Sequence, residues 1–347
     1  MVRVIQSPSD FTVIGENIHA TRVFLKNGRR VASLEDGNEV IPFKLENGDE
    51  RHLVIPDWFK STQPYQQGQI KHFLIAMMKG ISDNAEDRNE ATAYIQAEVR
   101  RQVSNGADYL DLNVDEIHYD IEIQKRAMEW IVQTVQEVSE VPPCIDSSLS
   151  EIISIGLESY SGAAGRPLLN SVAFERLDCL DLAVEHDARI KVMATSPDGM
   201  PEDDAERVNN VNGIIEHVIG KGMSLDDVFV DGIVFLISVD PQNGNHYLNA
   251  VHKLRQIYGS EIHIGGGLSN VSFGMPKRRL INTAFLYLAI EAGIDSGIID
   301  PVQTKIESVL ELDTSSESVG YAMDMLLGRD DFCMNFIQAY RDGKLVG

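Results

Sequence analysis

The chain has 347 residues and is strongly acidic, with a formal net charge of −23 and a sequence pI near 4.7. Its 43% hydrophobic and 24% charged content is that of an ordinary globular protein. So much negative charge argues against a general surface for nucleic acid or an anionic membrane, and solubility is its simplest role. An anionic ligand would need a local group of positive side chains.

Cysteine usage and hydropathy indicate the compartment. The three cysteines, Cys144, Cys179 and Cys333, show no C-x-x-C spacing, which predicts reduced thiols without a disulfide framework or a zinc site. The first residues lack a signal-peptide core, and no apolar run reaches about 18 residues. We therefore expect a soluble, cytoplasmic protein.

Short apolar runs alternate with longer amphipathic stretches along most of the chain. The predicted strands are residues 11–15, 109–114, 143–147, 168–172, 190–195, 228–234, 261–265 and 296–300. Stretches with helical spacing of apolar residues are 90–106, 123–138, 177–186, 209–222, 249–259 and 278–293. This alternation predicts a parallel sheet, and eight repeats favour a closed (β/α)8 TIM barrel within one domain, 1–347. A doubly wound open sheet is the alternative.

Residues 23–80 interrupt this rhythm after the first strand. Asn27-Gly28, Asp36-Gly37 and Asn47-Gly48 lie between alternating apolar residues, which predicts an antiparallel β-meander of three or four strands, followed by a partly helical return. Connections that follow a barrel strand lie at the C-terminal face, where active sites are found. The insertion is therefore either a lid or docking element, or a decoration packed on the side of the barrel.

Polar residues gather where the predicted strands end. They are Glu16, Asn17, His19, Asp111, Asn113, Asp146, Ser147, Asn170, Ser171, Asp231, Ser269, Asn270 and Asp300. Asp and Asn are poor strand formers, so their repetition needs a reason. Capping of the next helix explains Ser147 and Asp300 best. Asp111, Asp146 and Asp231 lie inside or at the end of apolar runs and must find donors, so we expect a pocket for a flat heterocycle with several N–H groups.

Other kinds of site find little support in the sequence. The nine histidines show no H-x-x-x-H or H-E-x-x-H spacing, and no nucleophile elbow or P-loop is present, so we expect no metal site. Gly265-Gly266-Gly267 is not a dinucleotide fingerprint, but it would let a ligand approach bare backbone. Lys277, Arg278 and Arg279 begin a helix, where positive charge opposes the helix dipole, so they are either an anion contact or a solvated helix start.

Six segments together resemble the pterin-binding methyltransferases, a family that includes methyltetrahydrofolate:corrinoid protein methyltransferases and the folate domain of cobalamin-dependent methionine synthase. The segments are residues 15–22, 106–116, 144–148, 168–176, 182–186 and 267–301. The resemblance covers the barrel and leaves the insertion unexplained. It implies methyl transfer between N5 of tetrahydrofolate and the cobalt of a corrinoid (cobalamin) on a partner protein, in either direction. Such enzymes serve one-carbon metabolism or O-, N- or halo-demethylation, commonly as homodimers.

The resemblance also implies roles for individual residues. Asp146, Asn170 and Asp231 match residues that hydrogen-bond the pterin ring, Asp111 and Asn113 match a motif lining the same pocket, and Arg278 matches an arginine close to the substrate. Asn270 matches a catalytic asparagine near N5. The chain departs from the family pattern in two places. Around Glu16 and His19 it has Gly-Glu-Asn-Ile-His, where the family usually has Gly-Glu-Arg-Ile-Asn. Asp231 is followed by Gly232, where the family has proline. His19 is either a pterin contact or a hydrogen-bonded core histidine.

Two rival functions share the pterin pocket. A dihydropteroate synthase would need a pyrophosphate site, usually marked by D-P-G-x-G-F-x-K and a final R-x-H; this chain has Asp-Gly-Ile-Val from residue 231 and nothing like the second motif. A non-catalytic pterin-binding module is the other rival. The chain has no corrinoid-binding D-x-H-x-x-G motif, so we expect the corrinoid to arrive on its partner.

Overall fold

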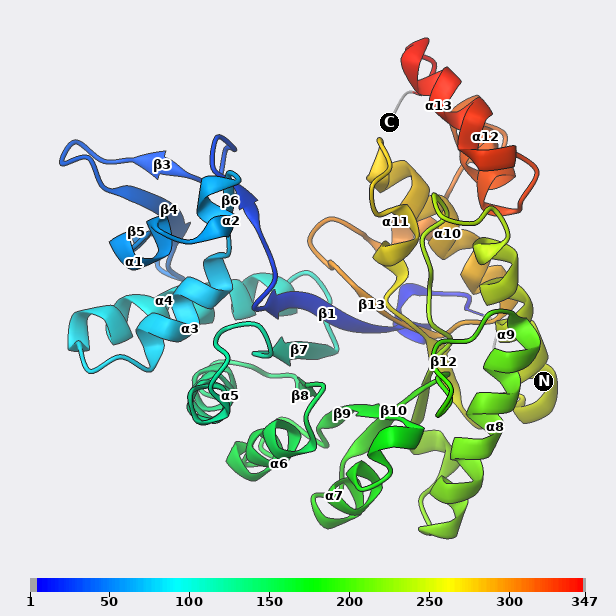
Figure 1. The fold of residues 1–347 in the computed structure, drawn as a ribbon, viewed down its shortest axis with the longest axis horizontal. Coiled ribbons are helices and arrows are strands. Elements are labelled where there is room, and N and C mark those ends of the chain that lie inside the picture. The colour runs from blue at the N-terminus through cyan, green and yellow to red at the C-terminus, as the bar shows by residue number, and fades with distance from the viewer. Residues whose placement is uncertain (1–4, 346–347) are drawn as a thin grey trace. The chain divides into compact units, whose positions relative to one another are not determined.

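The computed structural model describes residues 5–345 and confirms the predicted barrel. Eight parallel strands form a nearly closed (β/α)8 barrel with helices between them, in the order β12-β11-β10-β9-β8-β7-β1-β13 (Figure 1). The strands are β1 Thr12–His19, β7 Tyr109–Asn113, β8 Pro143–Asp146, β9 Leu168–Val172, β10 Arg189–Met193, β11 Val228–Asp231, β12 His263–Gly265 and β13 Ser296–Ile299. Every predicted strand is present, because apolar β-branched runs bounded by turn residues specify strands locally.

The helices follow the predicted amphipathic stretches and add several that were not predicted. Those with predicted counterparts are α4 Ala85–Val103, α5 Ile121–Gln136, α7 Cys179–Glu185, α8 Asp204–Gly220, α9 Asn243–Tyr258 and α10 Arg278–Ala292. The additions include α6 Ser150–Ser159, α11 Ile306–Leu310, α12 Glu317–Leu326 and α13 Met334–Arg341. Most of these are short, so their periodicity spans too few turns to stand out.

The chain folds as two compact units, residues 1–14 with 171–347, and residues 15–170. The second unit contains the insertion, β7, β8 and α3 to α6. The first contains β10 to β13 and α7 to α13. The expectation of a single domain over 1–347 stays a prediction.

The insertion contains the predicted meander. Strands β3 Ala32–Ser33, β4 Glu39–Lys44 and β5 Glu50–Val54 pair antiparallel. Gly37 and Gly48, in two of the three predicted turns, both have φ of 87°, a conformation that favours glycine. Asn27-Gly28 does not join two meander strands: it follows β2 Phe24–Leu25, which pairs with β6 Gln69–Ile70. Helices α1 Asp57–Lys60, α2 Gln63–Gln66 and α3 His72–Gly80 complete the return.

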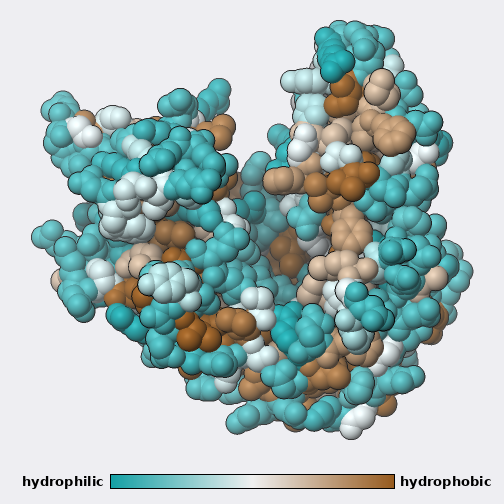
Figure 2. All heavy atoms as spheres, viewed as in Figure 1, coloured by the Kyte–Doolittle hydropathy of each residue, from teal (hydrophilic) through white to brown (hydrophobic). Residues whose placement is uncertain are grey.

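The inner face of the meander packs on α4. Ile41, Phe43 and Leu53 are buried on one face, and the Phe43 ring meets the Tyr94 ring of α4 edge-on, with centroids 5.2 Å apart. The Val54 N–H donates to Glu90 Oε1 of α4 at 2.8 Å. In Figure 2 the surface over β3, β4 and β5 is mostly hydrophilic. These contacts agree with a decoration on the side of the barrel, while a lid or docking role stays a prediction.

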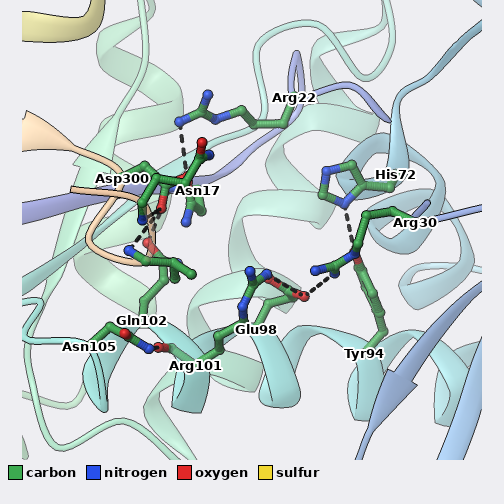
Figure 3. Close-up of polar contacts among 12 residues, drawn as sticks. Asn17, Arg22, Arg30, His72, Tyr94, Glu98, Arg101, Gln102, Asn105 and Asp300 are labelled. Atoms are coloured by element: carbon green, nitrogen blue, oxygen red, sulfur yellow. Dashed lines mark hydrogen bonds and ion pairs between the residues drawn. The ribbon is translucent and has the colours of Figure 1, made fainter. Parts of the chain in front are cut away.

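A buried polar group also ties the insertion to α4 (Figure 3). The His72 ring stacks on Phe24 with centroids 3.8 Å apart, and its Nδ1 lies 2.7 Å from the Tyr94 hydroxyl. Burial lowers the pKa of His72 well below its ordinary value, so the ring is neutral at pH 7. Arg30 donates to Glu98 of α4 at 2.9 Å. The insertion is thus held by stacking and hydrogen bonds as well as by apolar packing.

Among residues 5–345, no helix combines the length and apolar character needed to cross a membrane.

Candidate active site

Four predicted residues form a polar row at the ends of β7, β8 and β9, here named the β7–β9 cluster: Asp111, Asn113, Asp146 and Asn170. The strand register sets Asn113 beside Asp146, and Asp146 beside Asn170. Asp111 shares a face with Asn113, because side chains two residues apart in a strand point the same way. The Asn113 amide donates to Asp146 Oδ2 at 2.8 Å, and the Asn170 amide donates to Asp111 Oδ1 at 3.4 Å.

The β7–β9 cluster offers acceptors in a sheltered place. Asp111 is 3% exposed and Asn113 5% exposed, whereas Asp146 is half-buried. A carboxylate has about four acceptor sites, and the two amide donors use only part of the capacity of Asp111 and Asp146. Buried carboxylates are stable only when donors reach them. The cluster therefore suits a ligand that presents several N–H groups.

A supporting residue that the sequence analysis missed, Asp115, fixes the orientation of the Asn113 amide. The Asp115 N–H donates to Asn113 Oδ1 at 3.1 Å while the Asn113 nitrogen donates to Asp146, so the amide has one favourable orientation. The Asp115 carboxylate accepts from the Ser147 hydroxyl at 2.5 Å. Ser147 Oγ in turn accepts from the Leu149 N–H at 3.1 Å in the turn before α6, but the N-cap of α6 is Leu149, so the predicted helix-capping role of Ser147 is wrong.

His19 borders the β7–β9 cluster as a neutral imidazole. Its Nδ1 accepts from the Thr21 N–H at 3.2 Å, so the ring proton resides on Nε2, which lies 3.8 Å from Asp146 Oδ2. Burial lowers the pKa of His19, and the nearby Asp111 carboxylate opposes that effect. An Nε2–H facing the cluster would be available as a donor to a bound ligand.

Glu16 finds its partner within its own segment. Its carboxylate forms an ion pair with Arg22, whose Nε also donates to the Glu16 carbonyl oxygen at 3.2 Å. Arg22 donates to the side chain of Asn17 as well, at 3.2 Å (Figure 3). Arg22 was not among the predicted residues, although a basic residue six positions after Glu16 was a visible signal.

In the other unit, Asp231 ends β11 and has two partners, an ion pair and a backbone hydrogen bond. Its Oδ2 lies 2.8 Å from Lys191 Nζ, and its Oδ1 accepts from the Ile233 N–H at 2.9 Å. The expectation that this carboxylate must be paired is met by a residue that the sequence analysis missed. Lys191 is 2% exposed within the apolar run of β10, and a lysine in such a run was the available signal.

The glycine triplet lets protein atoms approach the backbone. A Cβ on Gly266 would lie 3.0 Å from Asp231 Oδ1, and one on Gly267 would lie 3.0 Å from Asn270 Nδ2. A Cβ on Gly265 would clash with the Ser296 carbonyl oxygen at 2.4 Å. Bare backbone thus has a structural reason here: it lets Asp231 and Asn270 lie against the same loop.

Asn270 lies in the 3-10 helix η4, Leu268–Ser272, and its side chain is exposed. Within the described part of the chain, its side-chain amide hydrogen-bonds no other residue, while its backbone N–H donates to Gly267 O at 3.1 Å. Arg278, at the start of α10, donates to Ser272 Oγ and to Ser269 O, both at 3.0 Å. Arg278 therefore fastens the turn that carries Asn270 and leaves the amide of Asn270 accessible.

Asp300 binds the backbone that follows β13. Asp300 Oδ1 accepts from the Val302 and Gln303 N–H groups at 2.9 and 3.3 Å and so holds the turn after β13; the next helix, α11, begins at Ile306 with Lys305 as its N-cap, so the predicted helix-capping role of Asp300 is wrong. Between residues 5 and 345, no group of three or more His, Cys, Asp or Glu side chains is arranged to hold a metal ion. A cavity of about 800 Å³ between the meander and α4 is lined by residues such as Phe43 and Arg101 and by none of the predicted site residues.

Comparison with known proteins places these residues in a family. The family model described as pterin binding enzyme matches residues 80–300, which begin where the insertion ends and include both the β7–β9 cluster and Asn270. A methylcorrinoid:tetrahydrofolate methyltransferase from Eubacterium limosum is 30% identical over 268 residues, covering 75% of this chain and 91% of that protein.

Solved structures show the same fold. Dihydropteroate synthase from Stenotrophomonas maltophilia has a TM-score of 0.53 at 15% identity, covering 65% of this chain and 89% of that chain. The Xanthomonas albilineans dihydropteroate synthase in complex with 7,8-dihydropteroate has a TM-score of 0.52 at 16% identity, covering 68% and 88%. This likeness shows the fold alone, whereas the family match and the relative from Eubacterium limosum show the family. The chain belongs to the family of pterin binding enzymes.

Proposed function

We propose that this protein is a methyltransferase that moves a methyl group between N5 of tetrahydrofolate and the cobalt of a corrinoid carried by a separate protein. The observation that carries this proposal is the β7–β9 cluster, with its sheltered carboxylates and oriented amides. The chain belongs to a pterin-binding family and aligns over 91% of a relative named for this reaction. We take the direction from that name, with tetrahydrofolate as the methyl acceptor.

We assign pterin recognition to Asp111, Asn113, Asp146, Asn170 and Asp231. The carboxylates would accept from the ring N–H and amino groups, and the asparagine amides would donate to the ring oxygen or nitrogen atoms. Glu16, His19 and Arg278 are assigned to binding as well: His19 through its Nε2–H, Glu16 through its pairing with Arg22, and Arg278 through the turn it fastens.

The transfer step needs help at N5. When the methyl group passes to tetrahydrofolate, the N5–CH3 bond forms and the N5 proton leaves; in reverse, a nitrogen anion would be a poor leaving group without a proton or a hydrogen bond. The corrinoid supplies the cobalt that gives up or accepts the methyl group. The Asn270 side chain has both an acceptor and donors, so it can bind N5 in either direction. A bond that strengthens in the transition state raises the rate more than it raises the affinity.

The proposal includes a place in the cell. We expect a cytoplasmic homodimer that serves one-carbon metabolism or the demethylation of O-, N- or halomethyl compounds. The corrinoid protein and the folate are its partners.

The direct test is spectroscopic. Mixing the protein with 5-methyltetrahydrofolate and cob(I)alamin should convert the cob(I)alamin spectrum to that of methylcobalamin at a rate proportional to enzyme concentration, because a catalyst accelerates both directions. Folate binding without any spectral change would favour a non-catalytic pterin-binding module. Condensation of a pterin pyrophosphate with 4-aminobenzoate would favour a dihydropteroate synthase. Either result would contradict the proposed methyl transfer.

The insertion is proposed to help capture the corrinoid protein. Deleting residues 23–80 is expected to weaken that capture and leave pterin binding intact, but deletion would also expose the apolar face of α4, including Tyr94 and Ile95. A milder change is Leu25→Asp, because Leu25 is 69% exposed on β2. We expect the KM for the corrinoid protein to rise by roughly tenfold, the effect of one interface side chain, while turnover of free cobalamin stays constant.

The matched control for Leu25→Asp is Val184→Asp, at a 51% exposed apolar position on α7. It should leave the KM for the corrinoid protein unchanged. Equal KM values for Leu25→Asp and the unsubstituted protein would count against a docking role for β2.

A further inference from the structure

Lys191 is a buried cation within the β-barrel strand β10. Its side chain is 2% exposed, its chain neighbours Ile190 and Val192 are fully buried, and its Nζ lies 2.8 Å from Asp231 Oδ2. Lysine is almost never fully buried unless it is paired, and removing one partner of a buried ion pair is costly. Lys191 and Asp231 therefore form a buried ion pair whose loss would disturb the position of both side chains.

The other carboxylate oxygen of Asp231, Oδ1, is also held in place. It accepts from the N–H of Ile233, a β-branched residue with φ of 56°, which is rare for such a side chain. The guanidinium of Arg207, fully buried, donates to Gly232 O at 2.9 Å and to Ile233 O at 3.3 Å. A strained backbone conformation persists only where surrounding contacts hold it in place. Arg207 thus holds the turn whose N–H orients the Asp231 carboxylate.

The other groups around Asp231 do not supply a second counter-charge. Tyr247 of α9 donates its hydroxyl to Gly265 O at 2.9 Å, and burial, with the Asp231 charge, raises the pKa of Tyr247 well above its ordinary value, so it is neutral. His263 of β12 pairs with Asp295 at 2.9 Å. Arg207 of α8 binds backbone carbonyls. Among the described residues, the ion pair of Asp231 is made by Lys191.

We propose that Lys191 is a positioning residue that holds the Asp231 carboxylate in place for pterin binding, an inference that rests on the proposed function. A carboxylate has about four acceptor sites, and the Ile233 N–H occupies one of them, so acceptor sites remain for ligand N–H groups. The ion pair with Lys191 holds Oδ2, and the Ile233 N–H holds Oδ1.

The test compares Lys191→Met with the unsubstituted protein. Methionine has a similar length without charge, so it removes the ion pair that holds Asp231 Oδ2. Affinity for 5-methyltetrahydrofolate is measured by titration calorimetry at pH 7. We expect the variant to bind about tenfold more weakly than the unsubstituted protein, the loss of one charge-assisted hydrogen bond to the ligand.

Two further variants keep the test decisive if Lys191→Met folds poorly. The double variant Lys191→Met/Asp231→Asn carries no buried unpaired charge, and it should bind folate as Asp231→Asn does, because Lys191 acts through Asp231. Lys79→Met is the matched control: Lys79 is 6% exposed and pairs with Asp87 at 3.0 Å in the other unit. It should leave folate affinity unchanged.

Several outcomes would overturn the inference. One is a Lys191→Met affinity for the folate that equals that of the unsubstituted protein. Another is a double variant that binds folate a further tenfold more weakly than Asp231→Asn, which would mean that Lys191 contacts the ligand directly. Failure of the unsubstituted protein to bind the folate would overturn the proposed function itself, so the two failures are distinguishable.

Discussion

Replacing Asn270 with alanine is expected to lower the turnover of methyl transfer by roughly 10²-fold or more, with a much smaller change in folate affinity. The Asn270 amide is exposed and hydrogen-bonds no other described side chain or backbone group, so it is available to N5 without breaking a protein contact. Its backbone bonds to Gly267 O and from Phe273 N–H survive the substitution, which preserves the turn. Single-turnover rates and folate dissociation constants would be measured on the same preparations.

Two companion variants separate chemistry from structure. Asn270→Asp keeps the shape of the side chain but cannot donate a hydrogen bond when ionised, so it should be as slow as Asn270→Ala. Asn209→Ala replaces an exposed asparagine on α8 and should react at the unsubstituted rate. Equal losses in affinity and turnover for Asn270→Ala would show that the amide binds the ground state as strongly as the transition state.

Asp295→Asn is expected to lower the free energy of unfolding by about 3–5 kcal/mol, the cost of breaking a buried ion pair. Asp295 and Arg255 both have side chains that are 0% exposed, and they lie 2.7 Å apart. The carboxylate also contacts His263 at 2.9 Å and accepts from the Ile264 N–H at 2.8 Å. Substitution leaves the Arg255 guanidinium buried without its counter-charge. Urea unfolding at pH 7 measures the loss.

Asp295 should also make the stability of the protein depend on pH. Burial by itself would raise the pKa of Asp295, but the hydrogen bond with His263 and the Arg255 charge outweigh burial and hold that pKa below the ordinary value of 3.8. A carboxylate with a lowered pKa stabilises the fold above its unfolded-state pKa and loses that contribution as the pH falls through the folded-state value. The stability difference between Asp295→Asn and the unsubstituted protein should therefore be constant from pH 5 to pH 8 and shrink below pH 3.8.

Asp324→Asn provides the control for Asp295→Asn. Asp324 pairs with Arg329 at 2.7 Å, but the two side chains are 54% and 58% exposed. Water and salt screen such a pair, so its loss should cost only about 0–1 kcal/mol. If Asp295→Asn lowered the free energy of unfolding no more than Asp324→Asn does, burial of the Asp295 ion pair would add nothing to its stabilising effect.

Much of the architecture follows from local patterns in the sequence. Each apolar run bounded by turn residues became a strand, because side-chain alternation and backbone preferences act within a few residues. The turns at Gly37 and Gly48 were predictable for the same reason. Ser147 and Asp300 accept from N–H groups two or three residues away and hold the turns after their strands, although neither caps a helix. These features depend on neighbours in the chain.

Which partner a strand-end residue meets depends on register and packing, and only the tertiary structure decides it. The sequence placed Asp231 at a strand end, yet its pairing with Lys191 spans 40 positions and follows from how β10 and β11 align. The contact of Phe43 with Tyr94 likewise placed the meander on α4, because apolar area is buried wherever a complementary face lies. Local chemistry thus determined the elements and their polar ends, and long-range alignment determined the pairs.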